Sequence, residues 1–467
     1  MPYKFFHLHL PHLQHRHRDS VRMTEGSPRK VLTAFAFPIF LSQLFQQLYN
    51  TADAWIVSRY LGDDAFSAVS SSGSLVFLMI SFFVGASMGA GVVISRYFGA
   101  GNEERMTDAV HSAVLISLIC GLALTLMGGL LASCIPGWMQ LDPAVQPYAV
   151  PYLRCYFLGS LSLVMYNTFK GIMNAVGDSR RPLYYLIVSS VSNVFLDWLF
   201  LGPMGLDIRW AAIATAISQG ISALLCLRQL TKKGTVYALR WSRLRIDRWS
   251  LREILRYGIP TGVQNSVIGL ANVLVQSNIN SFDKLATAAC GAYSKIEGFA
   301  FLPITSYSMA LTTYIGQNLG AKQYDRARQG ARFGIWSAVL MAELIGLLFY
   351  LFAAPLISFF VQNPESIAIG VRQARTEALF YCLLSFSHCI AGICRGAGKA
   401  FVPMFIMLAV WCLLRITYIT IAMRINHNIV LLFWAYPMTW FISSVIYLIY
   451  YLRSDWIHGF DNAERLI

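Results

Sequence analysis

Residues 171–182 have the sequence GIMNAVGDSRRP, and residues 392–403 have the sequence GICRGAGKAFVP. Gly171 aligns with Gly392 at a shift of 221 (392 − 171 = 221), and Pro182 aligns with Pro403 at the same shift. The segments RYFGAGNEER at 96–105 and QNLGAKQYDR at 317–326 are related in the same way. A constant shift over separate segments indicates that the chain consists of two related halves.

Each half is rich in apolar runs. The chain has 467 residues, of which 56% are hydrophobic and 13% charged, whereas soluble domains contain about a quarter charged residues. A helix needs about 20 apolar residues to cross a bilayer. Such runs lie near 33–58, 65–97, 110–134, 148–174, 183–202 and 210–230, and again near 255–281, 286–317, 330–354, 377–397, 402–423 and 429–452. We therefore predict an all-α polytopic membrane protein with twelve transmembrane helices in two pseudo-symmetric six-helix lobes.

The predicted boundaries follow from these runs. Residues 23–230 form the N-terminal lobe, 231–252 a basic linker, 253–452 the C-terminal lobe and 453–467 a tail. Basic residues gather in the linker, and such loops face the cytoplasm, so we expect both termini there. Residues 1–22 contain five histidines. Such tracts occur in metal-binding tails, but the simpler expectation is a disordered extension.

An even number of spans in each half relates the halves by an axis along the membrane normal and places a cavity between them. Two similar bundles around one cavity are suited to alternating access. Motifs for a catalytic metal or an activated nucleophile, such as H-E-x-x-H or G-x-S-x-G, are missing from the sequence. We expect no enzyme activity, no cofactor and no metal site. The positive charge of +14 lies in short loops, so we expect no nucleic-acid partner.

Placing a charged side chain at the centre of a membrane span costs roughly 2.5–3.5 kcal/mol of insertion free energy. Each charged residue in a span therefore needs a structural or functional reason. Asn193 and Asp197 are four residues apart and share one helix face, and Asp53 lies late in the first span. The duplication kept glycines and prolines but not these acids, since Asp197 aligns with Tyr418. A cation site is needed only once, so we predict cation coupling at Asp53, Asn193 and Asp197. Alternatively, Asp53 is hydrated at the membrane surface and Asp197 makes a local polar contact.

Other polar residues in the spans are candidates for lining the cavity. Tyr49 lies one turn before Asp53, and Lys170 shares a face with Asn174. Lys170 either neutralises an acid or extends towards the lipid headgroups. Lys295 and Arg415 are further candidates, and the simplest expectation for Arg415 is a buried charge balance with Glu343.

The chain from Thr24 to Tyr451 resembles the multidrug and toxic compound extrusion (MATE) family, most closely its DinF-like bacterial branch. The resemblance rests on segments such as FPIFLSQLFQQLYNTADAWIVSRYLG at 37–62, ISRYFGAGNEER at 94–105 and NVFLDWLFLGP at 193–203. It implies twelve helices in two six-helix lobes around a central cavity, and export driven by the entry of a proton or a sodium ion. We expect an antiporter that works as a monomer in the bacterial inner membrane. Such a protein exports drug-like small molecules in exchange for H⁺ or Na⁺. A lipid or polysaccharide flippase is the alternative function.

The resemblance also concerns individual residues. In DinF-like members an acid late in the first helix and an Asn-x-x-x-Asp pair in the fifth form the cation site, and these positions match Asp53, Asn193 and Asp197. Other branches have a glutamate in the seventh helix. The matching segment here, TGVQNSVIGLANV at 261–273, offers only Gln264 and Asn265, which we include among the candidate cavity residues.

Overall fold

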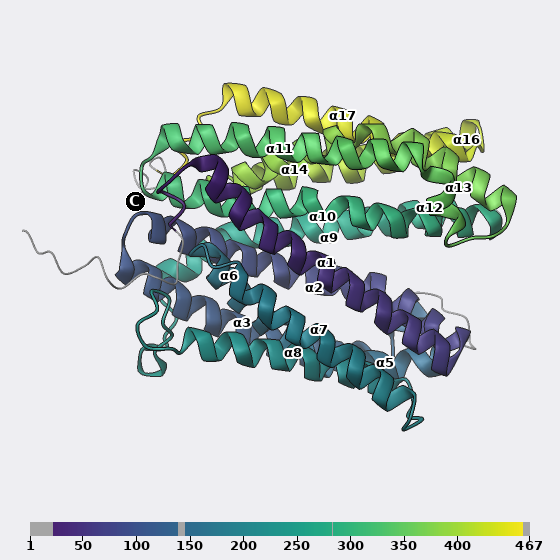
Figure 1. Ribbon diagram of the computed structural model, residues 1–467, viewed down its shortest axis with the longest axis horizontal. Helices are drawn as coiled ribbons and strands as arrows, with labels where there is room; N and C mark the ends of the chain where they lie inside the picture. Colours follow the sequence, from purple (N-terminus) through teal and green to yellow (C-terminus); the bar gives the residue numbers. More distant parts are fainter. Residues whose placement is uncertain (1–21, 139–144, 283, 461–467) are drawn as a thin grey trace, which may run out of the picture.

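The structure, a computed structural model, describes residues 22–138, 145–282 and 284–460. All regular secondary structure in these ranges is helical. The helices lie side by side in two bundles, with the first half of the chain (purple to teal) in the lower part of Figure 1 and the second half in the upper part. The predicted fold class, an all-α protein of two helical lobes, is confirmed. The predicted extension at 1–22 lies outside the described residues, apart from Arg22.

The N-terminal lobe contains six spans. These are α1 (Pro28–Leu61), α2 (Asp63–Gly99), α3 (Glu103–Leu131), the broken pair α5 (Gln146–Leu158) and α6 (Ser160–Ala175), α7 (Arg180–Leu201) and α8 (Arg209–Leu230), with a short α4 at Ile135–Trp138.

The C-terminal lobe repeats this order. Its spans are α9 (Arg248–Ile279), α10 (Lys284–Gly320), α11 (Tyr324–Leu351), the pair α13 (Pro364–Glu377) and α14 (Tyr381–Gly396), the pair α15 (Phe401–Met407) and α16 (Arg415–Ile425), and α17 (Ile429–Arg453), with a short α12 at Ala353–Ser358. A π-helical segment, Leu408–Leu414, joins α15 to α16. A 3₁₀ turn, Ala378–Phe380, joins α13 to α14.

Nine of the described segments are long and apolar enough to cross a membrane by length and composition alone. The other three predicted spans correspond to α5 with α6, to α9 and to α10. Of these, α9 and α10 both pack against α2 in the opposite lobe. Their contacting faces need small and polar residues rather than a uniformly apolar surface.

The lobes are in close contact at one end of the molecule. We call this the linker end, since it contains the connection at residues 231–247. A Cβ atom at Gly89 of α2 would lie 2.3 Å from the backbone nitrogen of Gly258 on α9, and one at Gly99 would lie 1.9 Å from the carbonyl oxygen of Gln317. Only glycine allows this approach. Towards the opposite end, α1 and α2 diverge from α9 and α10 (Figure 1).

Polar contacts reinforce the junction at the linker end. The Arg96 guanidinium on α2 forms a buried ion pair with Glu253 on α9, with 3.0 Å between Nη1 and Oε1. The Tyr97 hydroxyl donates a hydrogen bond to the second oxygen of Glu253 at 2.7 Å. The buried ring of Phe460, beyond α17, lies 4.4 Å from the Arg96 guanidinium carbon. These contacts join elements of both lobes.

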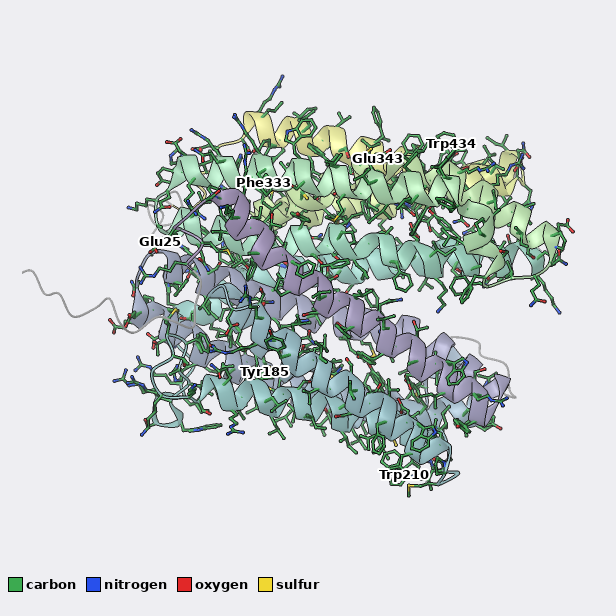
Figure 2. All side chains as sticks on the ribbon, in the orientation of Figure 1. Glu25, Tyr185, Trp210, Phe333, Glu343 and Trp434 are labelled. Carbon is green, nitrogen blue, oxygen red and sulfur yellow. The ribbon has the colours of Figure 1, made fainter. Side chains whose placement is uncertain are left out.

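The segment before α1 is held by the C-terminal lobe. Arg326 on α11 donates hydrogen bonds to the carbonyl oxygens of Met23 at 2.9 and 3.0 Å, of Glu25 at 2.6 Å and of Gly26 at 2.5 Å. Met23 is fully buried, and its backbone N–H donates to Gln317 at 3.0 Å. Glu25 lies at the linker end in Figure 2.

Candidate cation site in the N-terminal lobe

Two acidic residues from different helices face each other inside the N-terminal lobe. Asp197 on α7 has no exposed surface, and Asp53 on α1 is half-buried. Their carboxyl groups lie within hydrogen-bonding reach of each other. No donor among the described residues bonds to either oxygen of Asp197 or to Oδ1 of Asp53. Two ionised carboxylates cannot hydrogen-bond to each other, so this arrangement needs a shared proton or a bound cation.

Uncharged polar groups extend this site along the lobe interior. Asn193, one turn before Asp197, is 1% exposed, and neither of its amide atoms has a described hydrogen-bond partner. The Gln219 amide on α8 donates to the Tyr49 hydroxyl on α1 at 3.2 Å, while its oxygen is unpaired. A narrow cavity is lined by Tyr49, Ser189, Ser190, Asn193, Thr215, Ser218 and Gln219. Unsatisfied buried polar atoms are rare in folded proteins and mark places for water or an ion.

Helix geometry explains why these residues meet. Tyr49 and Asp53 are one turn apart on α1, and Asn193 and Asp197 are one turn apart on α7, so each pair shares one helix face. The helices α1 and α7 pack against each other, and α8 packs against α7. The three inward faces therefore enclose the acids. The structure brings together Asp53, Asn193 and Asp197 as the sequence suggested, with Tyr49 beside them.

The chemistry of the site suits a proton or a small cation. Carboxylate and amide oxygens are ligands that hard cations prefer. A cluster of three or more His, Cys, Asp or Glu side chains that could hold a metal ion is not found among the described residues. The acids lie on two helices, α1 and α7, so neutralising their charges changes how strongly these helices attract or repel each other.

The remaining candidate residues lie in different surroundings. Gln264 on α9 is 2% exposed and donates to the Met407 sulfur at 3.0 Å, while Asn265 is half-buried. Lys295 on α10 is exposed, three residues before Gly298, which lies against Gln47 of α1. Lys295 therefore lies on the side of α10 that faces the N-terminal lobe.

Lys170 and Asn174 lie inside the N-terminal lobe. The Lys170 ammonium lies 5.4 Å from the centre of the Tyr166 ring. Asn174 is 8% exposed, and its side-chain oxygen has no described partner. Neither residue joins the Asp53–Asp197 pair directly.

A second group of buried charges, in the C-terminal lobe, was not found from the sequence. Glu377, the last residue of α13, has no exposed surface and accepts a hydrogen bond from Gln373 at 3.0 Å. Arg415 interacts electrostatically with Glu377 and with Glu297 on α10. It also donates to the Thr439 hydroxyl at 2.7 Å. The signal that could have revealed Glu377 is its position within one continuous helical segment, Pro364–Gly396.

The expected charge balance between Arg415 and Glu343 is therefore wrong. Glu343 lies on α11 (Figure 2), where it accepts a hydrogen bond from the backbone of Cys382 at 3.3 Å. Arg415 is instead covered by the Tyr436 ring, 4.5 Å away, and faces two other acids. In the C-terminal lobe the guanidinium permanently supplies the positive charge that the N-terminal acids lack.

Comparisons with known proteins agree with this architecture. A model of the MatE family matches residues 38–199 and 260–421, two segments offset by one repeat length. A probable multidrug resistance protein of Bacillus subtilis is 29% identical over 84% of this chain and 86% of its own length. The probable multidrug resistance protein NorM of Thermotoga maritima is 28% identical over 82% and 83%. The structure of a multidrug resistance MATE family transporter in an outward-facing conformation superposes with a TM-score of 0.87 at 21% identity, covering 93% of this chain and 97% of that one.

Proposed function

The chain belongs to the MatE family of membrane transporters, and from this premise we propose that it exports drug-like small molecules in exchange for a cation. Members of this family are transporters rather than enzymes and use ion gradients rather than cofactors. The observation that carries the proposal is the pair formed by Asp53 and Asp197. Their facing carboxyl groups have no described donor or counter-charge, so a mobile cation fits between them.

The exchange cycle follows from the charge of this pair. Without a cation, two adjacent carboxylates repel each other and push α1 away from α7. A bound cation removes the repulsion, and the two helices pack more closely. Because α1 also contacts α10 of the other lobe, this repacking alters the space between the lobes where the substrate is held. Cation entry thereby drives substrate release.

The orientation of the protein follows from its basic linker. Residues 231–252 contain seven basic residues and one acid, so we place the linker end and both chain termini in the cytoplasm of a bacterial cell. The close junction at that end and the divergence at the other correspond to a state open to the outside. We propose that the protein works as a monomer, because each chain already supplies both lobes.

The proposed substrates are drug-like molecules, cationic or amphipathic. The relatives described above are named as multidrug resistance proteins, and the described acids of the N-terminal lobe attract positive charge. A flippase for long anionic lipids would need unpaired arginines along its cavity. Arg415 does not meet this need, since it is buried and interacts with two glutamates.

The test uses the isosteric variants Asp53→Asn and Asp197→Asn. Both variants are expected to reach the membrane and to lose efflux of a fluorescent dye by about tenfold or more, because an amide cannot take up a proton or neutralise a cation. Asp207→Asn is the control, since Asp207 lies in the loop before α8 with its side chain 56% exposed. Full efflux in both acid variants would contradict coupling at this pair.

A further inference from the structure

We propose that Lys295 selects the exported molecules by charge, and that the preferred substrates are amphipathic molecules with a carboxylate that binds its ammonium group. This inference rests on the proposed export function and deepens it, by naming the chemical class of the substrate. Two observations carry it. Lys295 lies opposite the N-terminal lobe in an open part of the space between the lobes, and no described acid neutralises its charge.

Contacts with α1 show which face of α10 is turned towards the N-terminal lobe. The Thr305 hydroxyl on α10 donates a hydrogen bond to the side-chain oxygen of Gln43 on α1 at 2.6 Å. A Cβ atom at Gly298 would lie 3.6 Å from the amide nitrogen of Gln47. Gln43 and Gln47 are one turn apart on α1, and Thr305 and Gly298 are two turns apart on α10. The two helices therefore run antiparallel, with these two faces in contact.

The same two faces are open further from the linker end. Lys295 precedes Gly298 by three residues, so it shares this face of α10, and it is exposed. Asn50 follows Gln47 by three residues on the facing side of α1 and is also exposed. Two turns beyond Gly298, a Cβ atom at Gly291 would meet nothing within 4 Å. Since α1 and α10 diverge in this direction (Figure 1), Lys295 and Asn50 lie on opposite walls of the space between the lobes.

The charge of Lys295 is not balanced within the described part of the chain. Its ammonium forms no ion pair with a described carboxylate. Glu297, two residues further on, points in another direction and interacts with Arg415. Asp53 on α1 faces Asp197 inside the N-terminal lobe. A lysine within a span usually pairs with an acid or extends to the headgroups. Because Lys295 faces the other lobe and has no acid beside it, its charge is available to a ligand.

The groups around Lys295 suit a carboxylate. The ammonium offers three N–H donors and no acceptor. The exposed Ser294 hydroxyl next to it and the Asn50 amide on the opposite wall are further donors. Hydrogen bonds between an ammonium and a carboxylate are roughly twice as strong as those between neutral groups. One positive charge among neutral donors matches a ligand group with a single negative charge.

A carboxylate at Lys295 is compatible with a positive charge elsewhere in the same molecule. The acids Asp53 and Asp197 belong to the N-terminal lobe, on the other side of the space from Lys295. A zwitterion bound at Lys295 can therefore turn its cationic end towards these acids. The preferred substrates are accordingly zwitterions and amphipathic anions rather than simple cations.

The experiment uses the full chain in proteoliposomes and two dyes that differ at one group. A zwitterionic rhodamine has a free carboxylate on its phenyl ring. Its methyl ester has the same ring system but carries only the positive charge. Accumulation of each dye is measured at a series of dye concentrations, with pH and sodium gradients imposed together. We expect the wild type to have an apparent KM about tenfold lower for the zwitterion than for the ester.

Substitutions of Lys295 test whether its charge causes this preference. Lys295→Gln is expected to raise the KM for the zwitterion about tenfold and, by removing a repulsion, to lower the KM for the ester. Transport of the ester by this variant also shows that it folds. Lys295→Arg keeps the charge and should keep the preference, whereas Lys295→Glu should reverse it. Lys232→Gln is the matched control, because Lys232 is exposed in the linker and its loss should not alter the preference.

The phosphate of an anionic lipid headgroup is a second source of a single negative charge. Liposomes that contain a fluorescent phosphatidylglycerol separate the two sources. We expect the protein to move this lipid between leaflets no faster than protein-free liposomes do. Lipid movement that is present in the wild type and lost in Lys295→Gln would overturn the carboxylate class in favour of an anionic lipid.

The remaining outcomes separate the inference from the proposed function. Equal KM values for the two dyes in the wild type would overturn the inference while leaving the exporter intact. An equal loss of transport of both dyes in Lys295→Gln would show a structural role for Lys295 and would also overturn it. No accumulation of either dye by the wild type would overturn the proposed function itself.

Discussion

Asp197 and Glu377 show two ways in which a membrane protein accommodates a buried carboxyl group. Both side chains have no exposed surface. Glu377 accepts a hydrogen bond from Gln373 at one oxygen and interacts with Arg415, so a counter-charge already lies beside it. Asp197 faces only a second acid. Removing a counter-charge from a buried group costs several kcal/mol, so the incomplete site is the one that responds to an ion arriving from outside.

A further residue-scale prediction concerns the helix cap of α9. Asp247 accepts hydrogen bonds from the backbone and the hydroxyl of Ser250 at 2.8 and 2.9 Å, and the backbone bond lowers the pKa of Asp247. The stabilisation by the Asp247 carboxylate is therefore fully present above the ordinary aspartate pKa of about 4. It is lost as the pH falls through the lowered pKa that Asp247 has in the folded protein. Asp247→Ala is expected to reduce the unfolding free energy by about 1 kcal/mol at pH 7.

Unfolding measured at a series of pH values tests this prediction. Denaturant unfolding in detergent should show the difference between wild type and Asp247→Ala shrinking as the pH falls below about 4. Asp247→Asn keeps the cap without titrating, so it should remain within a few tenths of a kcal/mol of the wild type at pH 7. A deficit in Asp247→Ala that stays constant with pH would rule out the carboxylate cap.

At the scale of helices, the sequence predicted where spans occur better than where they break. The predicted span 148–174 is divided at Gly159, where a Cβ atom would lie 2.5 Å from that of Ala216. The predicted span 377–397 begins earlier, because α13 runs from Pro364 into the turn before α14. That boundary placed Glu377 at the edge of the membrane and hid it as a candidate. Breaks depend on contacts between helices, which apolar runs do not encode.

The contact between α2 and α9 gives a prediction at this scale. At Gly89 a Cβ atom would lie 2.3 Å from the nitrogen and 2.5 Å from the Cα of Gly258. Both atoms belong to the backbone and cannot rotate away. Gly89→Ala should therefore separate the helices and lower the unfolding free energy by about 1–3 kcal/mol, measured by denaturant unfolding in detergent.

The matched control is Gly129→Ala on α3, where a Cβ atom would meet nothing within 4 Å. It should leave stability unchanged or raise it by up to about 1 kcal/mol, because alanine is the better helix former. Equal stability of both variants would mean that α2 and α9 separate without cost.

For the whole molecule, the duplication could be predicted from the sequence. Of the different roles of the two lobes, only the acids of the N-terminal lobe could be predicted, and the charge group of the C-terminal lobe could not. Asp53, Asn193 and Asp197 could be selected because each lies within an apolar run and helix spacing joins two of them. The partners of Arg415 could not, since several charged residues lie within the predicted spans of the C-terminal lobe and helix spacing joins none of them to Arg415. Which of them pair is decided by how the helices pack.

The ion pair between the lobes gives the last prediction. Glu253→Gln removes the acid opposite Arg96, which is 6% exposed, and so weakens the junction at the linker end. The opposite ends of the lobes should then approach each other. Spin labels at Tyr60, near the end of α1, and at Lys284, at the start of α10, should report a larger population of short distances.

Asp325→Asn is the control, because the pair of Asp325 with Arg328 is exposed and lies within one lobe. It should leave the distance distribution of the wild type unchanged. An unchanged distribution in Glu253→Gln would show that the ion pair does not influence the balance between states.

Arg326 donates its hydrogen bonds to Met23, Glu25 and Gly26 only at their backbone carbonyl oxygens. Carbonyl groups are the same in every residue, so this contact leaves the exposed side chain of Glu25 free to vary, whereas Met23 is also constrained by its buried side chain and Gly26 by its positive φ of 73°. The number of residues is constrained as well, because one inserted or deleted residue would rotate the next carbonyl out of reach of Arg326. Among relatives of this protein, the number of residues between Met23 and the first helix should therefore vary far less than the residue at the position of Glu25.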